Sequence, residues 1–424
     1  MVISALILSC FISFVPQAET KPKASGEVKT KPSAQKEGGT FALRAKHVYT
    51  AKGGIIENGI VIISGGKIVA IGPDLPIPAG ATEVSAECIT PGLIDANASG
   101  GEQFGAIEDS SEINPNFRIA DNIDAEDPAF VRLSRSGVTT GFFAPENRSV
   151  IGGLAAIVKT TPGLSPIIIN PEAALKGAFG ADPTLGNFTP RGFGLPNNFR
   201  VRRPGSRPAT VLEIRLALIQ AQKMVGKLGI VPPDFKPLVD VFEMEKQVRF
   251  HAYYLVELRS ALRVIREFGL KHVTIDGAAD AYHCADEIKA AGVNIVLHPF
   301  AREPLGGRNG LGRGIDYGDE KPAQDVLARL AAAGIPVALS AHGAAVEDDL
   351  AQQMRFAVRY GATRDLALRS VTLSAAEILG IQDRVGSIET GKDADLVLWS
   401  GDPFEFTSAP TQVFINGTPV WKRK

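Results

Sequence analysis

Short alternations of apolar and polar residues dominate both ends of the chain beyond residue 40. Residues 41–50 (FALRAKHVYT) alternate with a period close to two, which is typical of a half-buried strand. Gly65-Gly66 separates two similar runs, and Asn416-Gly417 separates two more near the C-terminus; both dipeptides favour two-residue hairpin turns. The simplest arrangement pairs these terminal β segments in one sandwich, with the middle of the chain folded separately between them.

The middle of the chain, from about Pro91 to Gly380, alternates apolar strand-like runs with amphipathic helical stretches. Repeated strand–helix alternation over this length predicts an eight-fold β/α barrel. A doubly wound open sheet is the alternative fold. Polar residues recur at many strand ends, which favours the barrel. The strand candidates are 137–144, 155–160, 247–253, 272–278, 293–299 and 335–343; the helix candidates are 210–225, 254–269, 281–292, 322–334 and 349–361.

The first 18 residues, MVISALILSCFISFVPQA, form an apolar run of about signal-peptide length. We interpret 1–18 as a signal peptide, with a retained membrane anchor as the alternative. Residues 19–40 are rich in Lys and Pro and predict a disordered linker. The protein is therefore expected to be exported to the periplasm or the extracellular space, with no transmembrane span once the signal is removed. Its folded region is divided into an N-terminal β-sandwich segment (41–90), a barrel (91–384) and a C-terminal β-sandwich segment (385–424).

Composition narrows the function only modestly. The formal net charge is −1 and 45% of the residues are hydrophobic, so the basic excess of a nucleic-acid-binding protein is absent from the sequence. Beyond the predicted signal, Cys88 and Cys284 form neither a Cys-x-x-Cys pair nor a disulfide framework, and we interpret both as core residues. The sequence leaves the oligomeric state open, a homo-oligomer being one option.

Several stretches together carry a resemblance to a known family. They include GGKIVAIG, TPGLIDA, SGVTTG, VRFHAYYLVEL, VTIDGAADAYHCADEI and, most distinctively, AAEILGIQDRVGSIETGKDADLVLW. The chain resembles the amidohydrolase superfamily, in particular its imidazolonepropionase-like branch. The resemblance implies a TIM-like (β/α)8 metal-dependent hydrolase barrel with a composite β-sandwich formed by the N- and C-terminal segments. It also implies hydrolysis of a non-peptide C–N bond, in a cyclic amide or a related small molecule, by metal-activated water.

Most of the metal-ligand positions that the resemblance implies carry other residues here. The His-x-His pair after strand one falls on Asn97 and Ser99, and the histidine of strand six falls on Asp276. The aspartate of strand eight falls on His342, whereas the histidine of strand five is kept as His251. Neutral amide and hydroxyl oxygens are far weaker ligands than imidazole for a transition metal. One of five positions therefore retains the expected residue type.

Two interpretations of the barrel mouth stay open. In the first, His251, Asp276 and His342 form a rearranged two-histidine, one-carboxylate site for one divalent metal such as zinc, and Asp276 and His342 carry the catalysis. In the second, the mouth holds no metal, and the protein is a non-catalytic binding or scaffolding protein that uses the mouth as a pocket. The expected pocket residues are Asn97, Ser99, Lys176 and His298.

Two arginine-rich stretches suggest the charge of a ligand. Residues 191–207 carry five arginines without an acidic residue, and 302–313 carry three more. Guanidinium groups bind carboxylates and phosphates through paired hydrogen bonds, so we expect a small anionic ligand at Arg200, Arg202 and Arg203. A solvated lid is the alternative interpretation of the same residues.

Overall fold

The structure is a computed structural model. It describes residues 39–101, 108, 111–163, 165–184, 203–227, 231–298, 323–341 and 349–424. The predicted signal peptide and all but the last two residues of the predicted linker lie outside these ranges. Within the described ranges of the chain, no helix combines the length and the apolar character needed to cross a bilayer.

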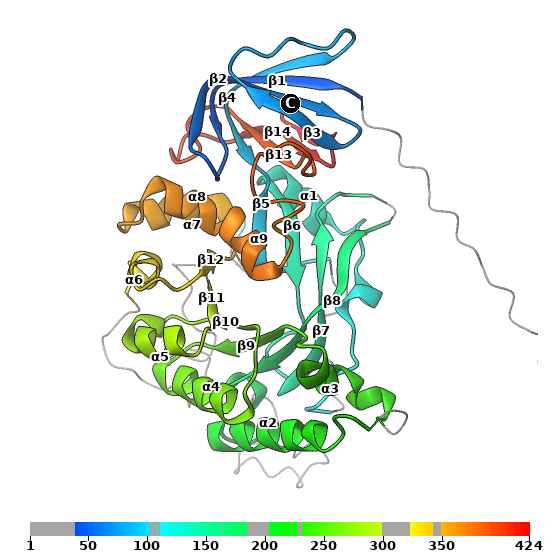
Figure 1. The fold of residues 1–424 in the computed structure, drawn as a ribbon, viewed down its shortest axis with the longest axis vertical. Coiled ribbons are helices and arrows are strands. Elements are labelled where there is room, and N and C mark those ends of the chain that lie inside the picture. Colours follow the sequence, from blue (N-terminus) through cyan, green and yellow to red (C-terminus); the bar gives the residue numbers. More distant parts are fainter. Residues whose placement is uncertain are drawn as a thin grey trace, which may run out of the picture. The chain divides into compact units, whose positions relative to one another are not determined.

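The terminal segments share one seven-stranded sheet, as the sequence predicts (Figure 1). Its strands come in the order β15-β14-β13-β4-β1-β2-β3, so the C-terminal strands join the N-terminal ones through the antiparallel pair of β4 and β13. Both predicted hairpin turns are present, and the positive φ of Gly65, Gly66, Asn416 and Gly417 is the conformation that such turns require. The strands are β1 (Phe41–Tyr49), β2 (Ile55–Ser64), β3 (Lys67–Gly72), β4 (Thr82–Pro91), β13 (Leu396–Trp399), β14 (Pro410–Ile415) and β15 (Thr418–Lys422).

The second sheet has eight strands in sequential order, from β5 to β12, and is a nearly closed barrel. It approaches closure where the amide of Ala341, just beyond β12, donates to the carboxylate of Asp95 on β5. The expected mixed α/β barrel is therefore confirmed. The strands are β5 (Leu93–Ala98), β6 (Val138–Phe143), β7 (Ile151–Lys159), β8 (Ile167–Ala178), β9 (Val248–Ala252), β10 (Val273–Gly277), β11 (Asn294–Leu297) and β12 (Val337–Leu339).

Strict strand–helix alternation fails at one point of the barrel. β7 runs antiparallel to both β6 and β8, while the other neighbouring strands are parallel. The connections on either side of β7 are short, and antiparallel neighbours need no crossover helix. From β8 onward the alternation returns.

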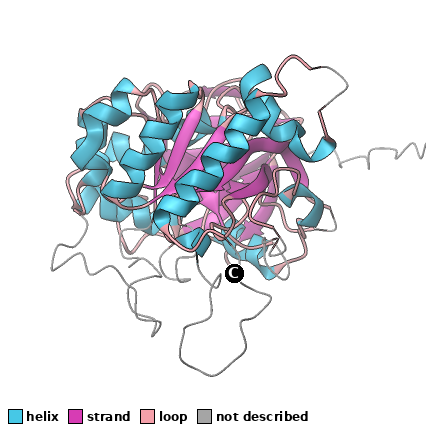
Figure 2. Ribbon diagram, turned by 90° about the horizontal axis from the view of Figure 1, so that it is seen from below, coloured by secondary structure: helices cyan, strands magenta, loops and turns pink. Residues whose placement is uncertain are grey.

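Helices lie around the barrel strands (Figure 2). The main hydrophobic core lies between the outward side chains of the strands and the buried faces of these helices. In α4, for example, Leu258, Leu262 and Ile265 repeat at helical spacing, and Gly269 ends the helix in the left-handed conformation. The α-helices are α1 (Pro128–Arg135), α2 (Arg207–Gln222), α3 (Lys236–Glu243), α4 (Leu255–Phe268), α5 (Ala285–Ala290), α6 (Val326–Ala332), α7 (Leu350–Arg359), α8 (Arg364–Ser370) and α9 (Leu373–Leu379); the 3-10 turns are η1 (Ile119–Asn122), η2 (Asp182–Thr184), η3 (Pro233–Phe235) and η4 (Ala281–Cys284).

A buried ion cluster connects the barrel to the seven-stranded sheet. The ammonium of Lys159, at the end of β7, is fully buried and lies 2.6 Å from Asp395 and 3.2 Å from Asp393. Asp395 also accepts a hydrogen bond from the Asn416 amide in the β14–β15 turn. Buried ion pairs, in addition to strand pairing, thus connect regions of the chain that are distant in sequence.

Candidate functional site

Side-chain alternation on β9 and β10 sends one set of residues to the helices and the other into the barrel. The outward set, Val248, Phe250, Val273 and Ile275, belongs to the core against the helices. The inward set is polar and almost wholly buried: Arg249, His251, Thr274 and Asp276. The strand register places Asp276 beside His251. Polar side chains in the barrel interior thus come from two neighbouring strands, residues 248–251 (VRFH) and 273–276 (VTID).

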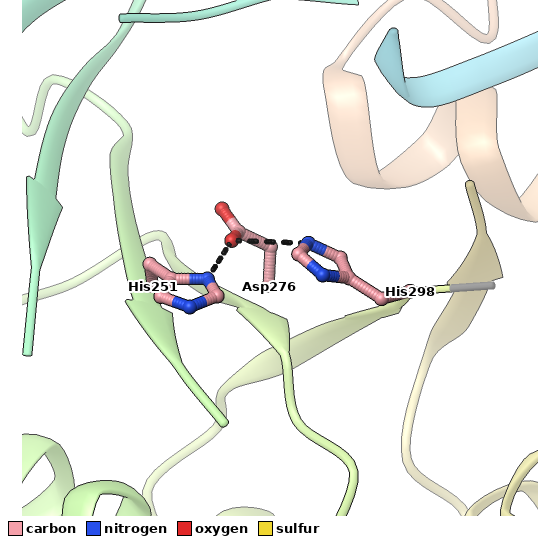
Figure 3. A group of neighbouring side chains, drawn as sticks. All are labelled: His251, Asp276 and His298. Carbon is pink, nitrogen blue, oxygen red and sulfur yellow. Dashed lines mark hydrogen bonds and ion pairs between the residues drawn. The ribbon is translucent and has the colours of Figure 1, made fainter. Parts of the chain in front are cut away.

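Asp276 is the centre of the cluster at the barrel mouth (Figure 3). One carboxylate oxygen lies 2.5 Å from the Lys176 ammonium of β8, and the other lies 2.7 Å from His251 Nδ1. His298, which follows β11, approaches the second oxygen at 3.7 Å. Burial opposes the charge of this carboxylate, but Lys176 and His251 hold the pKa of Asp276 well below its usual range.

His251 is held between two carboxylates. Its Nδ1 faces Asp276, and its Nε2 lies 3.4 Å from Asp182 of η2. Burial lowers the pKa of His251, but the hydrogen bonds to Asp182 and Asp276 outweigh it and raise that pKa to about 9. His251 is therefore an imidazolium at neutral pH, with both ring nitrogens acting as donors.

His298 completes the cluster from the other side of Asp276. Its ring lies 5.3 Å from that of His251, and its Nε2 lies 3.3 Å from the side-chain amide of Asn97 on β5. Burial lowers the pKa of His298, and the neighbouring positive charge of His251 acts in the same direction. The hydrogen bond to Asp276 acts in the opposite direction but does not outweigh them. His298 Nε2 accepts the Asn97 amide hydrogen in the tautomer that leaves this nitrogen without a proton.

The structure brings together four of the residues expected at the mouth and one of the two expected weak ligands. Lys176, His251 and His298 each face the Asp276 carboxylate, and Asn97 joins the cluster through His298. Ser99, in contrast, lines a cavity of about 380 Å³ whose other walls include Leu133, Trp421 and Arg423, and which none of the clustered residues lines.

The remaining predicted residues fall elsewhere. His342, Arg200 and Arg202 lie outside the described residues, so the roles predicted for them stay predictions. Arg203 is described: its side chain is 80% exposed and lies 3.6 Å from Glu213 of α2. The anionic ligand expected at these arginines also stays a prediction.

The sequence interpretation missed Asp182 and Arg249. Asp182 lies in η2 after the end of β8, and strand alternation gives no signal for it. Arg249 had a signal, because it lies two residues before His251 in an otherwise apolar strand and therefore shares its inward face. Its guanidinium is fully buried, donates to the Ala96 carbonyl at 3.1 Å and lies 4.3 Å from the centre of the Phe142 ring.

The cluster can be tested against the divalent metal that the resemblance implies. Donor atoms of His251, Asp276 and His298 all lie within 4.8 Å of one another, which is close enough for shared ligation. However, the two Asp276 oxygens already face Lys176 and His251, so a metal would have to displace these partners. As arranged, the residues do not offer a divalent ion an open set of ligands.

The fold defines a class of protein: a TIM-like barrel combined with a sheet built from both chain ends. A sequence profile described as "Amidohydrolase family" matches residues 236–420. An amidohydrolase from Thermotoga maritima superimposes with a TM-score of 0.77 at 26% identity, over 90% of this chain and 100% of that one. The imidazolonepropionase of Acidiphilium cryptum is 23% identical, over 83% of this chain and 89% of its own length. Residues 236–420 thus carry an amidohydrolase family domain, and the relatives and the superimposed structure are consistent with the amidohydrolase superfamily.

One relative differs in length. Amidohydrolase tasK of Hapsidospora irregularis is 26% identical over 413 residues, which are 86% of this chain but 39% of that protein. This chain therefore spans about two-fifths of that relative.

Proposed function

We propose that the barrel mouth binds a small molecule without metal-assisted hydrolysis, and that the Lys176–Asp276–His251 cluster replaces the metal centre of the hydrolases. The observation that carries this proposal is the pairing of both Asp276 oxygens with cations of the chain itself. Metal binding would have to displace a buried ammonium and release a proton from His251 to solvent. Both steps cost free energy that an open ligand set does not demand.

The charge of the cluster is balanced internally. Lys176 and His251 supply two positive charges, while Asp276 and Asp182 supply two negative ones. Such a mouth can hold a polar ligand by hydrogen bonds to Asn97 and to the exposed face of Asp182. We keep a small anionic molecule as the proposed ligand class, because the arginine-rich stretches follow β8 and β11 in the sequence.

We also propose that the protein is exported from the cell, because its N-terminal run is apolar. Fractionation of the producing cells would test this proposal.

A second candidate is the metal-dependent hydrolysis of a non-peptide C–N bond, as the names of the imidazolonepropionase relatives suggest. The observation that favours it is the close approach of the donors of His251, Asp276 and His298. In this alternative, a metal would bind to these three residues and displace Lys176 from Asp276.

Metal binding separates the two candidates. We expect protein purified without chelator, and then dialysed against zinc, to contain far less than one equivalent of zinc. A chelator should leave its thermal unfolding unchanged, since no metal would contribute to stability. About one equivalent of tightly held zinc, lost on His251→Ala or His298→Ala but retained in the surface control His272→Ala, would refute the proposal in favour of the hydrolase.

A matched variant sharpens the experiment. Lys176→Met removes the competing ammonium and leaves one Asp276 oxygen without its cation. If Lys176 blocks the metal, this variant should bind zinc more tightly than wild type in a calorimetric titration. Equal, weak binding by the two proteins would show that Lys176 is not the obstacle.

A further inference from the structure

Arg249 carries a positive charge that no carboxylate of the described residues contacts. Its guanidinium lies on β9 one inward position before His251, and its side chain is fully buried. A guanidinium keeps its proton at neutral pH even inside a protein. A buried cation without a counter-ion destabilises the folded state, and folded proteins pair such charges.

Most hydrogen-bond donors of Arg249 have no acceptor within the described ranges of the chain. Nη1 donates to the Ala96 carbonyl, but Nε and Nη2 have no described partner. The face of the Phe142 ring covers one side of the guanidinium plane and supplies no hydrogen-bond acceptor to the edge. Buried donors in folded proteins are satisfied in the great majority of cases, so these N–H groups mark the place of a bound group.

Thr274 points to the same group. It pairs in register with Arg249 across β9 and β10, and both side chains lie on the inward face. Its hydroxyl is fully buried and also lacks a partner among the described residues. Side chains of paired residues on neighbouring strands lie about 5 Å apart, which lets one small ion contact both.

The nearest carboxylates are committed elsewhere. Both oxygens of Asp276 face Lys176 and His251. The Asp95 carboxylate on β5 accepts from the backbone amides of Asn97 and Ala341. The guanidinium therefore forms no ion pair with a carboxylate of the described residues.

We propose that the barrel interior binds one small monovalent anion of the halide class between the Arg249 guanidinium and the Thr274 hydroxyl. A single water molecule accepts two hydrogen bonds at most and leaves the charge uncompensated. A halide accepts from the unpartnered N–H groups and the hydroxyl at once and gives the guanidinium a counter-ion in direct contact. This inference is independent of the ligand proposed for the mouth.

Bromide tests the site directly, because its anomalous scattering locates it. Crystals of the whole protein grown in potassium bromide should show an anomalous peak beside Arg249 and Thr274. In solution, the unfolding temperature should rise with bromide concentration relative to potassium gluconate at equal ionic strength, and should do so over about a hundredfold range of concentration. Chloride should act in the same way.

Variants link the effect to the site. Arg249→Met should abolish both the peak and the bromide dependence, whereas Arg259→Met, which removes a half-exposed arginine paired with Glu287, should keep both. If Arg249→Met does not fold, Thr274→Val tests the same site and should weaken bromide binding by about tenfold. Bromide peaks confined to the surface of wild-type crystals, or a bromide effect equal in wild type and Thr274→Val, would overturn the proposal.

Discussion

The charge on His251 predicts how the stability of the protein depends on pH. The pKa of His251 is raised to about 9 in the folded protein, against 6.5 for an unperturbed histidine. The folded state therefore binds this proton more tightly than the unfolded state. The resulting stabilisation is fully present below pH 6.5 and is lost as the pH rises through about 9.

The magnitude follows from the two pKa values. The interval from 6.5 to about 9, at ~1.36 kcal/mol per pH unit, corresponds to about 3 kcal/mol of unfolding free energy. The His251 side chain is 6% exposed, so solvent screening reduces this value little. About 3 kcal/mol is a large fraction of the stability of an ordinary domain.

Other groups act mostly outside this interval. Burial lowers the pKa of His298, so its effect falls below pH 6.5, and burial raises the pKa of both described cysteines to about 11, so theirs falls above pH 9. Burial also lowers the pKa of Lys176, and this makes the protein more stable as the pH rises toward 10.5. Because the Lys176 effect opposes that of His251, the measurement must compare wild type with a variant.

Urea unfolding at pH 6.5 and pH 9 provides the assay. Between these two values, wild type should lose about 3 kcal/mol more unfolding free energy than His251→Gln. The control His272→Gln removes a histidine that is 60% exposed and should follow wild type. An identical pH response of wild type and His251→Gln would refute the charged, doubly paired state of His251.

Two stability predictions concern structural contacts away from the mouth. Lys159→Met should lower the unfolding free energy by about 3–5 kcal/mol, because it removes a fully buried cation from Asp395. The control Lys67→Met, at the half-exposed edge of the same cluster, should lower it by less than ~1 kcal/mol. Equal losses of the two variants in urea unfolding would contradict this reasoning. Gly180→Ala should lower the unfolding free energy by about 1–3 kcal/mol, because φ at this position is +95° and the added Cβ would lie 2.3 Å from Glu257 Oε1. A thermal unfolding midpoint equal to that of wild type would show that Glu257 can move aside.

Local patterns account for most of the fold. Hairpin dipeptides and alternating runs predicted both ends of the seven-stranded sheet, because turn chemistry and side-chain alternation are properties of neighbouring residues. The reversed direction of β7 was beyond such reasoning. An apolar run such as Ala155–Thr160 reads the same in either direction, and its orientation depends on pairing with β6 and β8.

The sequence predicted which individual residues lie at the mouth, but it did not predict how they pair with one another. Strand ends identified His251, Asp276 and His298 as neighbours of the mouth. No sequence pattern indicated that Lys176, 100 positions before Asp276, would pair with it. An ammonium on a long side chain can reach several partners, and only the three-dimensional register of β8 to β10 selects one of them.

The pairing of Lys176 with Asp276 also explains how this barrel can fold with an inward carboxylate on strand six. A buried carboxylate requires a positive partner, which a bound cation or a side chain can supply. Here the side chains of Lys176 and His251 supply that charge, so the Asp276 carboxylate has its positive partners as soon as β8, β9 and β10 pair. A metal centre would make folding depend on the metal concentration. In the proposed binding function, a mouth closed by its own ammonium avoids this dependence and recognises its ligand by hydrogen bonds and by the charges around it.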